Sequence, residues 1–217
     1  AIPRLGTINL HASLLPDYRG AAPINWVIIN GEKNTGVSTF FINENIDTGD
    51  IIDQRSIKID ILDSYGDLYH KLKKIGADLV LDSVNNIIEN KINLKPQINT
   101  SNLNSANKLN KENCKIEWTM KASKVYNMIR GLSPYPGAHC FLVHKKETLK
   151  IIIYSSKIEI ETHQLNNGQI IIEKKQIKIA TTDGFIIPQE IKVQGKKRMS
   201  VSDLMNGFKF DLDSKFI

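Results

Sequence analysis

NLHASLLPDYRGAAP, residues 9–23, is the densest group of polar side chains in the sequence. A short apolar run from Gly6 to Leu10 leads into it and predicts a strand. If residues 7–11 are extended, Asn9 and His11 point to the same face, because alternate side chains of a strand do so. The end of a strand in an α/β sheet presents side chains to a cleft. The pair is compatible with an amide donor beside an imidazole, which suits stabilising an oxyanion while a proton moves. The alternative is a structural histidine, the commoner role near the end of a strand.

A second polar cluster, NIDTGD at residues 45–50, lies between two predicted strands at 36–42 and 51–59. Two interpretations of Asp47 are open. In one, Asp47 closes its own turn through an Asx hydrogen bond, as many loop aspartates do. In the other, Asp47 approaches His11 and orients the imidazole, which forms an acid–base unit.

The remaining elements of the first half alternate between helix and strand. A helix is predicted at 21–30, opened by Pro23, and a long amphipathic helix is predicted at 64–90 with Ser64 as its N-cap. Strands that alternate with helices predict an α/β layer structure.

The second half has a different pattern. Residues 90–111 are rich in Asn, Ser and Lys and show no periodicity, so we divide the chain into a domain at 1–91, a linker at 92–111 and a domain at 112–217. A helix at 121–131 and five short strands at 138–143, 149–153, 169–173, 177–180 and 185–193 are predicted after the linker. Five short strands with few helices predict a small β-barrel of the OB type.

Charge is divided unevenly along the 217 residues, whose formal net charge is +6. Residues 1–98 carry 10 Lys and Arg against 12 Asp and Glu, net −2, and residues 99–217 carry 19 against 11, net +8. The basic second half suits a nucleic-acid partner, although a lysine-rich solvated surface is the alternative.

Several classes of protein do not fit the sequence. No apolar run is long enough for a membrane span, and residues 1–7 do not resemble a secretory signal. Cys114 and Cys140 form no CxxC pair and have no neighbouring histidine pair, so neither a metal site nor a disulfide framework is predicted. We expect a soluble, cytoplasmic protein without a membrane partner.

HASLLPDYRGAAP at residues 11–23 and DTGD at 47–50 together resemble the folate-dependent formyltransferases. The resemblance implies a catalytic set of Asn9, His11 and Asp47 and the formyl donor 10-formyltetrahydrofolate, with no metal. It also implies folate contacts from two stretches, Ser13, Leu14, Leu15 and Pro16 in the first and Thr48, Gly49 and Asp50 in the second. Core packing is the alternative for Leu14 and Leu15.

Three stretches of the second half, IEW at 116–118, IRGLSPYPGA at 129–138 and QGKKRM at 194–199, resemble the C-terminal domain of the branch of this family that acts on methionyl-tRNA. The implied reaction is formyl transfer to the α-amine of initiator methionyl-tRNA, a step of translation initiation, with no DNA partner. The implied fold is the second half of a Rossmann-like formyltransferase domain followed by an OB-like barrel that holds the tRNA.

Four basic residues are candidates for contact with tRNA phosphates. Lys196, Lys197 and Arg198 form a basic run that contacts phosphate or is only a solvated turn. Arg130 contacts phosphate or interacts with the dipole at the end of its own helix.

Two other functions remain open, namely a sugar or ribonucleotide N-formyltransferase and a non-catalytic RNA-binding module with a vestigial Asn9, His11 and Asp47. Members of the family carry the first half of the catalytic domain ahead of the Asn-x-His strand. We therefore expect the chain to be a fragment that is inactive by itself and whose partners include the missing N-terminal segment of its own domain.

Overall fold

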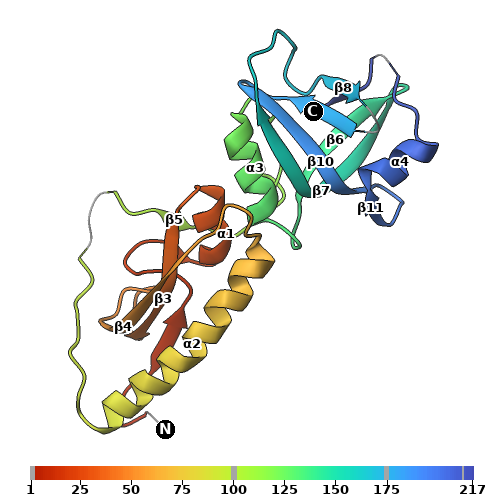
Figure 1. The fold of residues 1–217 in the computed structure, drawn as a ribbon. Helices are drawn as coiled ribbons and strands as arrows, with labels where there is room; N and C mark the ends of the chain where they lie inside the picture. Colours follow the sequence, from red (N-terminus) through yellow and green to blue (C-terminus); the bar gives the residue numbers. More distant parts are fainter. Residues whose placement is uncertain (1–2, 99–101, 174–175, 212) are drawn as a thin grey trace. The chain divides into compact units, whose positions relative to one another are not determined.

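The computed structural model describes residues 3–98, 102–173, 176–211 and 213–217. The chain forms two compact units, coloured from red to yellow-green and from green to blue in Figure 1. Unit 1 consists of Ala1–Ile28 and Glu32–Leu109, and unit 2 consists of Ile29–Gly31 and Asn110–Ile217.

Unit 1 contains a three-stranded sheet with the order β1-β3-β4. The strands are β1 (Ile8–His11), β3 (Asn34–Phe41) and β4 (Ile51–Lys58), close to the predicted positions. Both pairings are antiparallel, because β3 and β4 form a hairpin and β1 runs opposite to β3. The loop of this hairpin, residues 42–50, contains the second polar cluster. Asp47 of this loop lies close to His11 at the end of β1.

The predicted long helix is confirmed as α2 (Tyr65–Ile88). Its N-cap Ser64 accepts a hydrogen bond from the Asp67 amide, and the Asp67 side chain accepts one from the Ser64 amide, which completes a capping box. The predicted helix after Pro23 is confirmed as α1 (Pro23–Ile29). Both helices contribute to one core cluster, which consists of Tyr18, Val27, Ile28, Val37, Ile59, Leu68, Leu72, Leu79 and Ala106.

The segment assigned to the linker lies along unit 1. Lys95 and Ile51 exchange two backbone hydrogen bonds of 2.9 Å, and β5 (Ser105–Ala106) pairs in parallel with β2 (Arg19–Gly20). The pairing requires glycine at position 20, where φ is +124° and a Cβ atom would lie 2.5 Å from the Ala106 carbonyl oxygen. Residues of this segment therefore lie beside the loops that follow β1 and β3.

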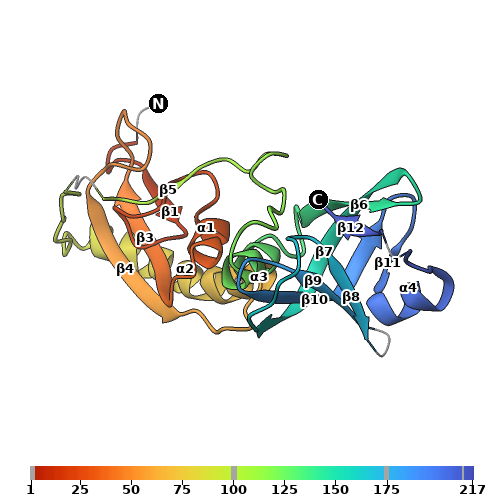
Figure 2. The same cartoon turned by 90° about the horizontal axis from the view of Figure 1, so that it is seen from above.

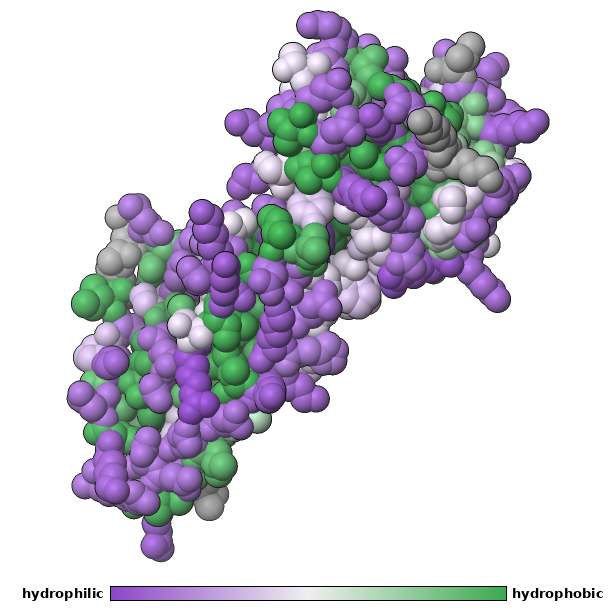
Figure 3. Space-filling model, in the orientation of Figure 1, coloured by the Kyte–Doolittle hydropathy of each residue, from purple (hydrophilic) through white to green (hydrophobic). Residues whose placement is uncertain are grey.

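Strand β1 is at the edge of its sheet, and Leu10 is 37% exposed. A groove of about 370 Å³ lies beside this strand and α2. Figure 3 shows apolar surface among the polar side chains of unit 1. The groove is lined mainly by Leu10, Ala12, Ile24, Val37, Tyr69 and Leu72.

Unit 2 contains a seven-stranded antiparallel sheet with the order β12-β6-β7-β10-β9-β8, in which β11 also pairs with β10. A bridge between Gln169 and Lys215 joins the start of β8 to β12, so the sheet curls until its two edges meet (Figure 2). The strands are β6 (Ala138–His144), β7 (Glu147–Ile160), β8 (Ile170–Glu173), β9 (Gln176–Ala180), β10 (Gly184–Val193), β11 (Arg198–Ser200) and β12 (Lys215–Phe216).

The five predicted strands of this half are found as β6 to β10, but β11 and β12 were not predicted and β7 is much longer than expected. β7 has 14 residues because its first half pairs with β6 and its second half with β10, and the overlap at residues 151–153 belongs to both. β10 has 10 residues and accommodates Pro188, which has no N–H to donate, at a shift in register. Two helices complete the unit, α3 (Ala122–Gly131), which was predicted, and α4 (Val201–Gly207), capped by Ser200.

Both cysteines, Cys114 and Cys140, are buried free thiols in unit 2. Burial raises the pKa of each thiol, so both remain protonated near neutral pH. In the described part of the chain, no helix combines the length and the apolar character that crossing a membrane would require.

Candidate active site

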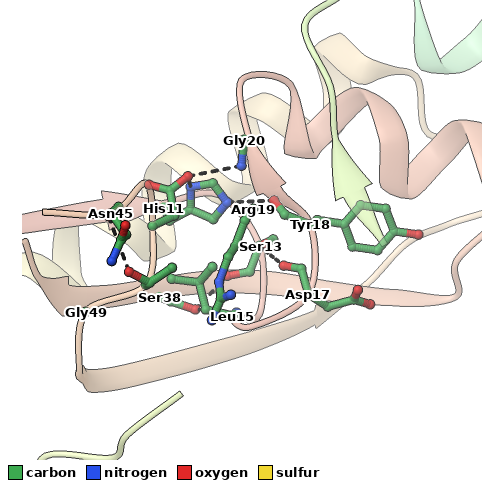
Figure 4. A network of polar contacts seen from close by, with 12 residues as sticks. His11, Ser13, Leu15, Asp17, Tyr18, Arg19, Gly20, Ser38, Asn45 and Gly49 are labelled. Carbon is green, nitrogen blue, oxygen red and sulfur yellow. Dashed lines mark hydrogen bonds and ion pairs between the residues drawn. The ribbon is translucent and has the colours of Figure 1, made fainter. Parts of the chain in front are cut away.

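His11 is the centre of a polar network at the end of β1 (Figure 4). The side chain is buried, and its Nε2 lies 2.8 Å from the backbone oxygen of Tyr18. Its Nδ1 lies 3.6 Å from Oδ2 of Asp47. Both ring nitrogens therefore face acceptors, and a doubly protonated imidazole would present an N–H to each of them.

The expectation that Asp47 approaches His11 is met in the geometry. Asp47 Oδ2 also accepts a hydrogen bond of 3.0 Å from the Gly20 amide, so the carboxylate is held from two sides. Its side chain is 13% exposed, which leaves a small opening toward water.

Two residues that contact His11 have a left-handed backbone, Tyr18 with φ of 59° and Asp47 with φ of 54°. Aspartate tolerates this conformation, but a tyrosine rarely adopts it, and each case costs roughly 1–3 kcal/mol. The Tyr18 hydroxyl donates to Glu32 and its amide donates to the Asn104 carbonyl oxygen, which anchors the residue. Strain of this kind is found preferentially at functional sites.

Asn9 lies two residues before His11 on the same strand and therefore on the same face. In register, Asn9 is opposite Phe40 and His11 is opposite Ser38. The Asn9 side chain is exposed, unlike that of His11. The amide is therefore accessible to a ligand beside a buried imidazole.

The four residues of the first predicted folate stretch differ in exposure. Ser13 is fully buried, and its hydroxyl donates to the Asp17 carbonyl oxygen at 2.6 Å. Leu15 is also buried, in a small core cluster with two residues of the sheet, Phe40 and Ile51. Leu14 and Pro16 retain partial exposure.

Ser38 of β3 fixes the backbone of this stretch. Its hydroxyl donates to the Ser13 carbonyl oxygen at 2.7 Å and accepts from the Leu15 amide at 3.0 Å. The Gln54 side chain donates to the Ser38 hydroxyl and to the Leu15 carbonyl oxygen. The environment of Leu15 is that of a core residue, which was the alternative considered for it.

The second predicted folate stretch forms the end of the hairpin loop. The Thr48 hydroxyl donates to the Asn43 side chain at 2.9 Å. Gly49 is buried against β3, where a Cβ atom would lie 1.6 Å from the Phe41 carbonyl oxygen, so any larger residue would displace the loop. Asp50 is exposed.

The basic run of unit 2 lies at the turn between β10 and β11. Lys196 and Lys197 are exposed there. Arg198 instead forms a two-point ion pair with Glu190 and stacks over the Tyr154 ring at 4.2 Å. The Arg198 guanidinium lowers the pKa of the Glu190 carboxyl, as expected for a close pair.

Arg130 is buried near the end of α3, and its Nε donates to the Asn127 side chain at 2.9 Å. This environment favours the structural interpretation of Arg130 over phosphate contact. For metals, the described residues contain no group of three or more His, Cys, Asp or Glu side chains arranged to hold an ion.

The sequence alone did not reveal several members of the network. Tyr18 acts through its backbone oxygen and Gly20 through its amide, so neither side chain gives a signal, although both lie within the quoted stretch 9–23. Ser38 and Gln97 lie far from that stretch in sequence. Their roles follow from tertiary contacts.

Comparisons with known proteins identify the class of protein to which the chain is similar. The family model described as formyl transferase matches residues 1–84, and the model described as formyl transferase, C-terminal domain, matches residues 108–209. Both halves of the chain thus match one class of protein.

Methionyl-tRNA formyltransferase of Flavobacterium johnsoniae is 49% identical over 214 residues, which cover 99% of this chain and 68% of the relative. The enzyme of the same name from Bacteroides fragilis is 42% identical over 212 residues, with 95% and 65% covered. The chain belongs to the methionyl-tRNA formyltransferase family. It spans about two thirds of the length of these relatives.

Solved structures share the fold. The N-formyltransferase of Helicobacter canadensis, crystallised with folinic acid and dTDP-3-aminofucose, is 28% identical with a TM-score of 0.65 over 83% of this chain and 64% of that chain. HypX from Aquifex aeolicus, crystallised with tetrahydrofolic acid, has a TM-score of 0.67 at 18% identity over 94% of this chain and 36% of that chain.

Proposed function

We propose that the chain carries the catalytic centre of an enzyme that transfers a formyl group from 10-formyltetrahydrofolate to the α-amine of initiator methionyl-tRNA, in the cytoplasm, for translation initiation. The observation that carries the proposal is the buried His11 between the Tyr18 carbonyl oxygen and the Asp47 carboxylate. Membership of the methionyl-tRNA formyltransferase family supports the choice of donor and acceptor.

In the proposed reaction the folate donor supplies a formyl group whose oxygen gains negative charge when the amine attacks its carbon. The exposed Asn9 amide donates a hydrogen bond to that oxygen. His11, when protonated, adds positive charge beside it. Asp47 orients His11 and, directly or through a water, takes the proton that the amine loses. The bond between the formyl carbon and N10 of the donor then breaks, and tetrahydrofolate leaves with a proton on N10.

The residues around His11 fit a folate donor in part. Leu14 and Pro16 offer apolar surface that remains partly exposed, and Thr48 and Asp50 offer polar groups at the end of the hairpin loop. Ser13 and Leu15 face the protein interior, and Gly49 is also buried, so these three shape the backbone of the binding site instead of contacting the donor by their side chains.

We also propose the finer fold assignment. The three-stranded sheet of unit 1 is the antiparallel part of a larger Rossmann-like sheet, which is a common combination in α/β folds. The curled sheet of unit 2 is an OB-like barrel, a proposal supported by the bridge that joins its two edges. We propose domains over 1–91 and 112–217, joined in sequence by the segment 92–111, whose residues up to Leu109 belong to unit 1.

The free edge of β1 and the apolar groove beside α2 support the proposal of a further segment that pairs with β1. An unpaired edge strand with exposed apolar side chains is a template for another strand. The chain spans 68% of the Flavobacterium johnsoniae relative, and a segment from the part of that relative outside the match is the candidate for this place.

The test of the proposed function is transfer of a labelled formyl group by the full-length protein whose reading frame contains this chain. We expect label on initiator methionyl-tRNA and none on a nucleotide-linked amino sugar, and no product from the 217-residue chain alone. Label on the amino sugar instead would establish the activity named for the Helicobacter canadensis relative. No transfer to either acceptor, with tRNA binding retained, would establish an RNA-binding module.

The tRNA contact is proposed for Lys196 and Lys197. Replacing both by glutamine should weaken tRNA binding about tenfold. The slope of log affinity against log salt concentration should also become shallower by about 1 per lysine, because fewer counterions are released on binding. Filter binding across a salt series measures both quantities.

Lys145 and Lys146 provide the matched control, since they are another exposed lysine pair at a hairpin turn of unit 2. Their replacement should leave the affinity within about twofold. Equal losses from the two double variants would show that only the total charge matters.

A further inference from the structure

Gln97 connects two loops of the active site, although it lies in the segment that the sequence assigns to a linker. Its Oε1 accepts from Nε of Arg19 at 3.0 Å and from Nη2 of Arg19 at 2.6 Å. Its Nε2 donates to the backbone oxygen of Asp47 at 3.0 Å and to that of Gly49 at 2.7 Å. One side-chain amide thus uses both of its ends on the loops that follow β1 and β3.

The position of Gln97 in its segment is itself fixed. Two residues earlier, Lys95 exchanges two backbone hydrogen bonds with Ile51, the first residue of β4. Gln97 is half-buried, whereas the residues from 93 to 98 on either side of it are exposed. Its side chain is therefore the one in this stretch that is directed into the protein.

The two loops that Gln97 joins are the ones that hold His11. The Gly20 amide, next to Arg19, donates to the Asp47 carboxylate, and that carboxylate faces His11. The Gly20 hydrogen bond and the Gln97 amide are thus parallel links between the same two loops. The second link matters because Asp47 has φ of 54°, and neighbouring contacts must hold a residue in this conformation.

We propose that Gln97 is a positioning residue for Asp47, acting through the backbone of the hairpin loop and not through the reactants. The proposal rests on the proposed function for its kinetic consequence. Its structural consequence, a firmly held Gly20–Asp47 hydrogen bond, is independent of the reaction. Loss of Gln97 therefore acts on kcat more than on KM, because the groups that bind the tRNA remain in place.

Two variants separate the two ends of the amide. Gln97→Met removes every hydrogen bond of the side chain at similar length. Gln97→Glu keeps an acceptor for Arg19 and places a carboxylate oxygen against the carbonyl oxygens of Asp47 and Gly49. Ile98→Ala is the control, since Ile98 is adjacent and 74% exposed.

In the full-length protein, we expect both Gln97 variants to lower kcat by about tenfold to a hundredfold, with KM for methionyl-tRNA within about twofold. In the same proteins, the Gly20 amide should exchange with solvent about tenfold faster, measured by hydrogen exchange with NMR detection. Ile98→Ala should change neither quantity. Circular dichroism establishes that each variant is folded.

The outcomes are distinguishable. Slower turnover without faster exchange at Gly20, or unchanged values of both, would overturn the positioning role. If Gln97→Glu behaves as wild type while Gln97→Met does not, the bond to Arg19 is the important one and the proposal is wrong. If the wild-type protein transfers no formyl group, the proposed function fails, and the exchange rate at Gly20 still decides the role of Gln97.

Discussion

Replacing His11 by alanine in the full-length protein is expected to lower kcat for formyl transfer about 10³-fold and to leave the affinity for tRNA within about twofold. His11 is buried between the Tyr18 carbonyl oxygen and the Asp47 carboxylate, and both of its ring nitrogens face these two groups. In the proposed reaction the variant loses the imidazole beside the developing oxyanion, which is the group that faces Asp47. The exposed lysines proposed to hold the tRNA lie in unit 2 and remain unchanged.

Single-turnover transfer of the labelled formyl group measures the first quantity, and filter binding measures the second. His70→Ala is the matched control, because His70 is an exposed histidine of α2 in the same unit. A His11 variant with near wild-type turnover would show that His11 is not part of the catalytic centre. Equal losses of turnover and of tRNA affinity would indicate a general structural defect instead.

Asp47→Asn should lower kcat about 10²-fold with little change in stability. Asparagine accepts the left-handed conformation that Asp47 adopts, and its side-chain oxygen accepts the hydrogen bond from the Gly20 amide. The variant therefore keeps the geometry and removes the negative charge next to His11. In the proposed reaction, the ability to receive the proton of the attacking amine is lost with that charge.

The measurement is the kcat of the folded variant, with its melting temperature recorded in parallel. Glu44→Gln serves as the control, since Glu44 is an exposed acid in the same hairpin loop. A loss of turnover of equal size in both variants would mean that turnover responds to any change of charge in the loop. A fully active Asp47→Asn protein would show that Asp47 does not accept the proton.

Local signals in the sequence were sufficient for most elements of the fold. The apolar spacing of α2 and the Ser64 cap are properties of adjacent residues, and both are found as predicted. The proximity of His11 and Asp47 was one of two open interpretations of the loop and was implied by the resemblance, and the structure places the two side chains 3.6 Å apart. The length of β7 did not follow, because it results from pairing with two different strands along one chain.

The contacts that complete the site depend on residues distant in sequence. Gln97 is separated from Arg19 by 78 positions, and no periodicity marks it within its Asn-rich segment. The Tyr18 carbonyl oxygen and the Gly20 amide act through the backbone, so their residue types do not indicate the role. For these groups the tertiary structure supplies information that pattern reading does not contain.

The two buried thiols make the protein convenient for spectroscopic labelling. Cys114 and Cys140 are the chain's complete set of cysteines, and both are protonated and inaccessible. Thiolate is the form that reacts with maleimide dyes, so the native thiols will react slowly. A cysteine introduced at Ile98 in unit 1 and another at Lys145 in unit 2 would take up a donor and an acceptor fluorophore in the otherwise unmodified protein. Energy transfer between them would then measure the distance between the two labelled positions with and without tRNA.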